Sequence, residues 1–132
     1  GSVDIQNVMS AVNAVQARVD NKLEVSTVHI TETWKSTDGN SWYRKWSDGF
    51  IEQGGKISNG NAWTWYTATL NTPFTKTSYT LVVVGVYVTD ATSASGQENN
   101  DYFLGKKSTN SFRYRQLGDV NDPTADWYAC GY

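Results

Sequence analysis

The first twenty residues of the chain carry a helical pattern of apolar positions. Ile5, Val8, Val12, Val15 and Val19 are spaced three and four residues apart, and polar residues fill most of the other faces. This spacing is the seam of a coiled coil, and β-branched residues at both core positions favour three or four strands over two. We therefore predict a helix that forms a trimer through these five residues. The alternative is a helix packed on its own domain, which such a narrow seam disfavours.

From Val25 onward the sequence has the pattern of short β-strands separated by turns. Trp63–Leu70 and Ser111–Leu117 both alternate between two faces, and the second segment places its arginines opposite its aromatic residues. Tyr79–Val88 is continuously apolar, which predicts a central strand covered on both sides. Together these segments predict an all-β fold, either a sandwich or a barrel, preceded by the short N-terminal helix. Of the two we expect an antiparallel β-sandwich.

The change of pattern divides the chain into two expected parts. Residues 1–24 are predicted to be the end of a coiled-coil stalk, and residues 25–132 the β-sandwich. Gly1 and Ser2 are typical of a cloning scar, so we expect the chain to be cut from a longer protein.

The clearest local signal is a hairpin within Ser41–Gly55, which reads SWYRKWSDGFIEQGG. Asp48 and Gly49 lie between two aromatic-rich runs and predict a two-residue type I′ loop, which needs positive φ at both positions. The expected register places these residues opposite each other: Ser47 and Phe50, Trp46 and Ile51, Lys45 and Glu52, and Arg44 and Gln53. It predicts a Lys45–Glu52 ion pair and a structural role for the aromatic residues of the hairpin, Trp42, Tyr43, Trp46 and Phe50. Gly54 and Gly55 are expected to form a bulge or a sharp exit.

This hairpin also carries a resemblance to a known family. WYRKWSDGFIEQGG resembles the Y-R-x-(Y/W)-S-D-G-(W/F)-I-E-Q-G-G opening of the C-terminal tip domain of tailed-phage and prophage tail fibres. Leu70–Val84 and Asp126–Tyr132 are similar to the middle and closing strands of that domain, so the likeness covers about Thr33 to Tyr132. A fainter likeness is to H-type lectin domains. The resemblance implies a homotrimeric β domain at a fibre tip that attaches a virion to the host surface.

Composition excludes several classes of function. The net charge of −2 provides no basic field for nucleic acid, and the apolar run Leu81–Val88 is too short to insert in a membrane. One cysteine, Cys130, and one histidine, His29, leave no disulfide framework and no conventional zinc site. We therefore predict no metal and no cofactor. The aromatic content is unusually high, with six Trp and eight Tyr, and these residues suit both a β core and a binding surface.

No catalytic constellation stands out in the sequence. A Ser-His-Asp arrangement could use only His29, which lies close to the stalk and is more typical of a structural residue. The carboxylates are numerous enough for a glycosidase pair, but no two of them are singled out by their positions. We interpret the domain as non-catalytic.

Residues suited to ligand binding concentrate after the apolar run. Thr89–Asn110 is a long polar segment that predicts a functional loop. Aromatic rings for the apolar face of a sugar, together with Asp, Asn and Arg for its hydroxyls, make the following residues candidates: Asn99, Asp101, Tyr102, Arg113, Arg115 and Trp127. For each residue alone a structural role is the alternative, since Tyr102 and Trp127 could equally pack in the core.

These observations support one main hypothesis on function. It is a non-catalytic receptor-binding tip of a phage or prophage tail fibre, a homotrimer that attaches the virion to a host cell-surface glycan or surface protein. The first alternative is a structural trimerisation cap of a fibre, without a receptor of its own. A weaker alternative is a small glycan hydrolase.

Overall fold

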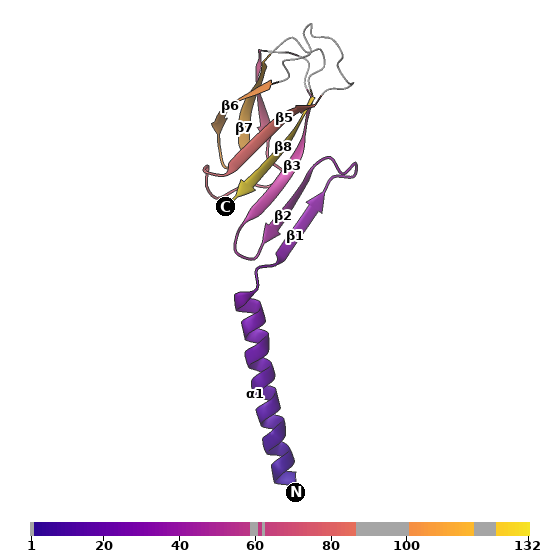
Figure 1. Cartoon of the computed structure of the whole chain (residues 1–132), viewed down its shortest axis with the longest axis vertical. Coiled ribbons are helices and arrows are strands. Elements are labelled where there is room, and N and C mark those ends of the chain that lie inside the picture. The colour runs from indigo at the N-terminus through magenta and orange to yellow at the C-terminus, as the bar shows by residue number, and fades with distance from the viewer. Residues whose placement is uncertain (1, 59–60, 62, 87–100, 118–123) are drawn as a thin grey trace.

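The computed structural model describes residues 2–58, 61, 63–86, 101–117 and 124–132, and it shows one helix followed by two antiparallel sheets (Figure 1). The elements are α1 (Ser2–Ser26), β1 (Ile30–Lys35), β2 (Trp42–Trp46), β3 (Ile51–Ser58), β4 (Trp65–Thr69), β5 (Thr80–Val86), β6 (Asp101–Lys107), β7 (Ser111–Leu117) and β8 (Thr124–Gly131). Strands β1-β2-β3-β8-β5 form the larger sheet, here called sheet A, and β4-β7-β6 form sheet B. The predicted antiparallel sandwich is confirmed.

Helix α1 projects away from both sheets (Figure 1). All five seam residues, from Ile5 to Val19, are between 45% and 63% exposed in the single chain. The helix is thus as predicted, and it does not pack on its own domain. It continues to Ser26, so Val25 is helical and the first strand begins only at Ile30. The division of the chain at residues 24 and 25 into stalk and tip stays a prediction.

The hairpin between β2 and β3 has a register that differs by one residue from the prediction. Trp46 N–H donates to Phe50 O (2.9 Å), and Gly49 N–H donates to Trp46 O (3.0 Å) with Gly49 at φ 90°. The loop therefore has three residues, a turn followed by a left-handed glycine. Lys45 pairs with Ile51 and Arg44 with Glu52, so the predicted two-residue loop and its cross-strand pairs are wrong.

The shifted register gives the charged residues of the hairpin other partners. Lys45 forms its ion pair with Glu32 on β1, at 3.0 Å, instead of with Glu52. Glu52 accepts one hydrogen bond from Trp46 Nε1 (2.9 Å) and another from the hydroxyl of Tyr128 on β8 (3.0 Å). The carboxylate thereby ties β2 and β8 to β3 across the outer face of sheet A.

Gly54 and Gly55 lie inside the continuous strand β3, so the predicted bulge or exit is wrong. Both glycines are instead covered by indole rings. A Cβ atom on Gly54 would lie 2.9 Å from Trp42 Nε1, and one on Gly55 would lie 2.6 Å from Trp127 Nε1. The pair thus allows one tryptophan to cross β3 on each face of sheet A.

The core fills the space between the two sheets. Its buried apolar residues are Ile51, Ile57, Leu70, Phe74, Tyr79, Phe112, Tyr114, Ala125, Trp127 and Ala129. Gln53 is fully buried among them, and its amide is satisfied by backbone groups. Its Nε2 donates to Thr72 O (2.8 Å), and its Oε1 accepts from Asn71 N–H (2.8 Å). These bonds fix the turn that leads from sheet B back to sheet A.

The continuously apolar segment forms β5, which is an edge strand of sheet A and not the predicted central strand. Leu81 and Val83 face the core, while Val82, Val84 and Val86 on the other face are 41–55% exposed. The apolar run is therefore covered on only one side within a single chain.

The predicted long loop is partly a strand. Asp101–Lys107 forms β6, which pairs with β7 from Asp101↔Leu117 onward. The alternation of exposed and half-buried residues is irregular in β6, where the register shifts between Leu104 and Lys107. Residues 87–100 of the predicted loop lie outside the described residues.

Candidate functional site

The predicted ligand-binding residues fall into three groups in the structure. Trp127 is only 7% exposed and packs edge-on against Phe112, with ring centroids 5.4 Å apart, so it belongs to the core. Tyr102 is half-buried beside Tyr114. Burial raises the pKa of Tyr102 to about 12, with the neighbouring Tyr114 adding to the shift. Asn99 lies outside the described residues, which leaves Asp101, Arg113 and Arg115.

The two arginines lie on the outer face of sheet B. Strand β7 buries Phe112, Tyr114 and Gln116, and the alternation of a strand then turns Arg113 and Arg115 away from the core. The predicted faces of this strand are confirmed. Arg115 lies opposite Trp65 on β4 and opposite Phe103 on β6. Residues directly opposite in a sheet share a face, so all three strands contribute to the same outer surface.

Each arginine lies against a tryptophan ring. The guanidinium carbon of Arg113 is 5.8 Å from the centroid of Trp65, and that of Arg115 is 5.3 Å from the centroid of Trp63. Phe103 completes the cluster by meeting the Trp65 ring edge-on at 6.3 Å. We call this cluster, Trp63, Trp65, Phe103, Arg113 and Arg115, the Trp–Arg face.

The backbone holds Trp63 in place before β4 begins. Its φ is +62°, the left-handed region that residues with a side chain rarely adopt. Its N–H donates to Gln116 O on β7 (2.9 Å), which ties this residue to sheet B. Despite the strained backbone, its ring is 54% exposed. An exposed aromatic ring in a strained conformation is more typical of a binding surface than of a core.

A hollow of about 260 Å³ lies within this surface, lined by Trp65, Gly105, Lys106 and Arg113. A Cβ atom on Gly105 would lie 2.7 Å from Cζ3 of Trp65. The ring therefore lies directly across the glycine, and any side chain there would push it out of position. The absence of a side chain at Gly105 shapes the hollow.

The cations of this surface have no acidic partner among the described residues. The ion pairs of the described chain are those of Lys45 with Glu32 and of Lys56 with Asp126. Arg113, Arg115 and Lys106 take part in neither, and Nε of Arg115 is buried without a hydrogen-bond acceptor among the described atoms. Asp101 lies at the start of β6 on the same side as Phe103. The surface therefore combines exposed aromatic rings with uncompensated positive charge.

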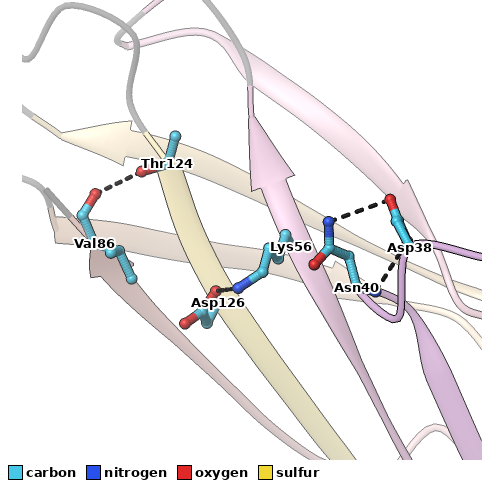
Figure 2. Close-up of polar contacts among 6 residues, drawn as sticks. All are labelled: Asp38, Asn40, Lys56, Val86, Thr124 and Asp126. Atoms are coloured by element: carbon cyan, nitrogen blue, oxygen red, sulfur yellow. Dashed lines mark hydrogen bonds and ion pairs between the residues drawn. The ribbon is translucent and has the colours of Figure 1, made fainter. Parts of the chain in front are cut away.

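A second hollow, of about 450 Å³, lies on sheet A, and the close-up in Figure 2 shows its polar contacts. Lys56 Nζ donates to Asp126 Oδ1 (2.8 Å), and Thr124 Oγ1 donates to the carbonyl of Val86 (2.6 Å). Asn40 is held by Asp38 in the turn between β1 and β2. Lys56 and Asp126 neutralise each other's charge, so they attract a charged ligand less strongly than unpaired groups would.

A third surface lies on the β1–β2 hairpin, at one edge of sheet A. The rings of Trp34 and Tyr43 stack with centroids 5.7 Å apart, beside a hollow of about 400 Å³. Hydrogen bonds from Lys45 and then Tyr43 lower the pKa of Glu32, and the Glu32 bond raises that of Tyr43. Lys45 and Glu32 thus neutralise each other, whereas the charged residues that line the hollow are Lys35 and Arg44.

The ligand-binding residues predicted from the sequence do not include the aromatic members of the Trp–Arg face, Trp63, Trp65 and Phe103. Its signal was present, because Trp63 and Trp65 alternate with Tyr66 and Ala68, which are half-buried. Two tryptophans on the outer side of a two-faced strand are the feature to look for. Phe103 has no such signal, because it lies in Thr89–Asn110, whose polar composition predicts a loop.

Comparison with known proteins adds information on the fold. No known protein-family model and no curated protein matches the sequence. The solved structures that match include an R2 pyocin fibre of P. aeruginosa (TM-score 0.57, 16% identity), an N-truncated R1-type pyocin tail fibre (0.54, 18%) and an N-truncated R2-type pyocin tail fibre (0.54, 18%). The fold is that of pyocin tail-fibre domains.

The extent of these matches differs between the fibres. The match covers 88% of this chain and 95% of the R1-type chain, but 77% of this chain and only 26% and 38% of the two R2 chains. The chain thus corresponds to about a third of those longer fibres. The pyocin-like architecture extends well beyond the hairpin, over most of the chain.

In the described part of the chain, no three His, Cys, Asp or Glu residues come together to hold a metal ion. No helix there is both long enough and apolar enough to cross a membrane. The Trp–Arg face is the strongest candidate for a functional surface.

Proposed function

We propose that this chain is a non-catalytic, receptor-binding domain of a phage or pyocin-like tail fibre, and that it attaches the particle to the host cell surface. The fold shared with pyocin tail-fibre domains supports this assignment. The observation that carries the binding role is the Trp–Arg face, where exposed aromatic rings lie on one sheet with arginines that have no acidic partner among the described residues. Its position at the tip of the fibre, on the virion, is part of the proposal.

A glycan is the receptor that this surface suits best. Sugar rings present an apolar C–H face that stacks on Trp65 or Phe103, and hydroxyl groups that accept hydrogen bonds from guanidinium. The hollow beside Gly105 has the size of a single sugar residue rather than of an extended protein epitope. This mode of binding is lectin-like, in line with the fainter resemblance in the sequence to H-type lectins.

The homotrimer is the second part of the proposal. Helix α1 exposes its whole seam, from Ile5 to Val19, to solvent in the single chain. Covering these residues in a three-stranded coiled coil removes them from water and places three β domains side by side. Three weak sites that engage one cell surface together bind far more tightly than one, because the second and third contacts are intramolecular.

A structural trimerisation cap is the alternative that the exposed seam favours. It accounts for α1 and for the exposed valines of β5. It gives no reason for a strained, exposed Trp63, or for arginines on the opposite sheet that form no ion pair within the described residues. The receptor-binding role explains both sets of observations.

Adhesion of the purified protein to bacterial cells tests the proposal. Trp65→Ala should abolish binding to a strain that the parent protein binds, while Thr67→Ala on the same face of β4 should leave it unchanged. Both variants should retain the parent's mass in light scattering. Full adhesion by Trp65→Ala would favour the structural cap, and release of reducing ends from the cell polysaccharide would favour a hydrolase.

A further inference from the structure

The charge of the Trp–Arg face specifies the class of glycan. Resting on the receptor-binding function proposed above, we infer that the ligand is an acidic sugar whose carboxylate or phosphate group lies in the hollow between Arg113 and Lys106, with the sugar ring against Trp65. The shared chemistry is an anion carried on a pyranose, and either group fulfils it.

The first argument is that two cations without an acidic partner among the described residues meet at one hollow. Lys45 and Lys56 each form an ion pair, and Lys107 Nζ donates to the carbonyl of Tyr79. By contrast, Arg113 and Lys106 line one hollow with no carboxylate from the described residues between them. Two like charges at one hollow repel each other, and an anion placed between them removes that repulsion.

The second argument is the presentation of the guanidinium groups. Each lies against an indole ring, at 5.8 Å for Arg113 and 5.3 Å for Arg115. The ring holds the guanidinium without using its N–H donors, so these donors stay available for an acceptor. A planar fork of donors matches the two oxygens of a carboxylate or a phosphate, and this charge-assisted pairing is about twice as strong as a neutral hydrogen bond.

The third argument is the contact with Gly105. The Trp65 ring crosses this glycine so closely that a Cβ atom would lie 2.7 Å from it. The ring therefore has a fixed place in the hollow that Arg113 and Lys106 also line. An aromatic floor with cations at its margin selects a ligand that has an apolar face and a charged substituent, which is the description of an acidic sugar.

The hollow on sheet A shows what a surface without this selectivity looks like. Lys56 and Asp126 line it and neutralise each other at 2.8 Å. An anion entering this hollow would have to displace a carboxylate that is already present. Among the described residues, no carboxylate lines the hollow beside Gly105.

Titration with simple sugars, followed by the indole N–H signals in an NMR spectrum of the full chain, tests the inference. The probes are glucuronate, glucose 6-phosphate and glucose, with sodium sulfate at equal ionic strength. We expect either anionic sugar, or both, to shift the signal of Trp65, and glucose to bind about tenfold more weakly or worse, because a hydrogen bond between charged groups is lost. The comparison of the two anionic sugars shows whether the site takes a carboxylate or a phosphate.

Variants make the assignment specific. Arg113→Gln should abolish the response, and Lys56→Gln, which removes the same charge from sheet A, should preserve it. An equal response to glucose would overturn the acidic-sugar inference and leave a receptor site for neutral glycans. An equal response to sulfate alone would show a simple anion site and overturn it as well. No response to any probe would also overturn it, while adhesion of Trp65→Ala still decides the proposed function.

Discussion

The centroid of the Trp63 ring lies 5.3 Å from the guanidinium carbon of Arg115, and this contact joins a strained backbone to a half-buried arginine. Trp63 adopts φ +62°, although a side chain in this region costs roughly 1–2 kcal/mol relative to an ordinary conformation. A cation–π contact at an exposed site returns only about 0.5–1 kcal/mol. Stability alone therefore does not account for a tryptophan at this position.

Trp63→Gly separates stability from binding. Glycine relieves the left-handed strain, so we expect a melting temperature equal to or above that of the parent chain, together with a loss of adhesion to host cells. Trp63→Val, which is β-branched and cannot relieve the strain, should lower the melting temperature. Full adhesion by Trp63→Gly would exclude the ring from the receptor contact.

Gly55 and Gly105 form a matched pair for a second prediction. Each is covered by an indole ring, Trp127 in the core and Trp65 on the surface. Gly55→Ala should destabilise the fold by about 1–3 kcal/mol, since overpacking in a core forces neighbouring groups to move. Gly105→Ala should leave denaturant unfolding nearly unchanged but weaken adhesion, because the Trp65 ring is displaced. Similar losses of stability in both variants would contradict a purely surface role for Gly105.

Alkaline pH should unfold the domain in a defined range. The pKa of Tyr128 is raised to about 12 by burial first and by the Glu52 hydrogen bond second, and burial raises the pKa of Tyr102 to about 12. The folded state holds these protons more tightly than the unfolded chain, whose tyrosines have a pKa of 10.0. Their contribution is therefore complete below pH 10 and is lost as the pH rises through about 12.

Ultraviolet titration of tyrosinate together with thermal melts checks this pH dependence. At least two tyrosines should ionise late, and the melting temperature should fall over the same range. In Tyr128→Phe one late-ionising group should be missing. Ionisation of every tyrosine near the ordinary pKa, without unfolding, would contradict the environments that the structure gives the Tyr102 and Tyr128 hydroxyls.

The seam of α1 predicts the oligomeric state. Light scattering should give about three times the chain mass of 14.7 kDa. Val12→Asp should disrupt the assembly, because it would bring three carboxylates together near the coiled-coil axis. Asn13→Asp adds the same charge at an exposed position beside the seam and should leave the mass unchanged. A monomeric parent chain with intact β structure would refute the trimer.

The sequence predicted those features that depend on local alternation. In β7 the period of two placed Phe112 in the core and Arg113 on the surface, and both positions are confirmed. The helix was predicted from its seam for the same reason. Both patterns act within one element, so no information about its neighbours is needed.

The wrong predictions concern features that depend on how a segment pairs with a neighbouring strand. The Asp48–Gly49 pair fits a two-residue loop and also a three-residue loop with Gly49 left-handed, and one residue of difference changed every cross-strand pair. Strand β5 is apolar throughout, but its position at the sheet edge depends on the pairing of β8 with β3. The Trp–Arg face was not predicted as a unit, because pairing of β4, β7 and β6 brings its residues together and no single segment of the sequence contains all of them.

The location of the receptor site is the central claim, and a charge-matched adhesion assay tests it most directly. The double variant Arg113→Gln/Arg115→Gln removes two positive charges from the Trp–Arg face, and Lys45→Gln/Lys56→Gln removes two from sheet A. Light scattering and melting curves must first show that both keep the parent's assembly and fold. We predict that the arginine variant loses adhesion to a host strain while the lysine variant binds like the parent. Equal adhesion by the two variants, or loss only in the lysine variant, would contradict a receptor site on sheet B.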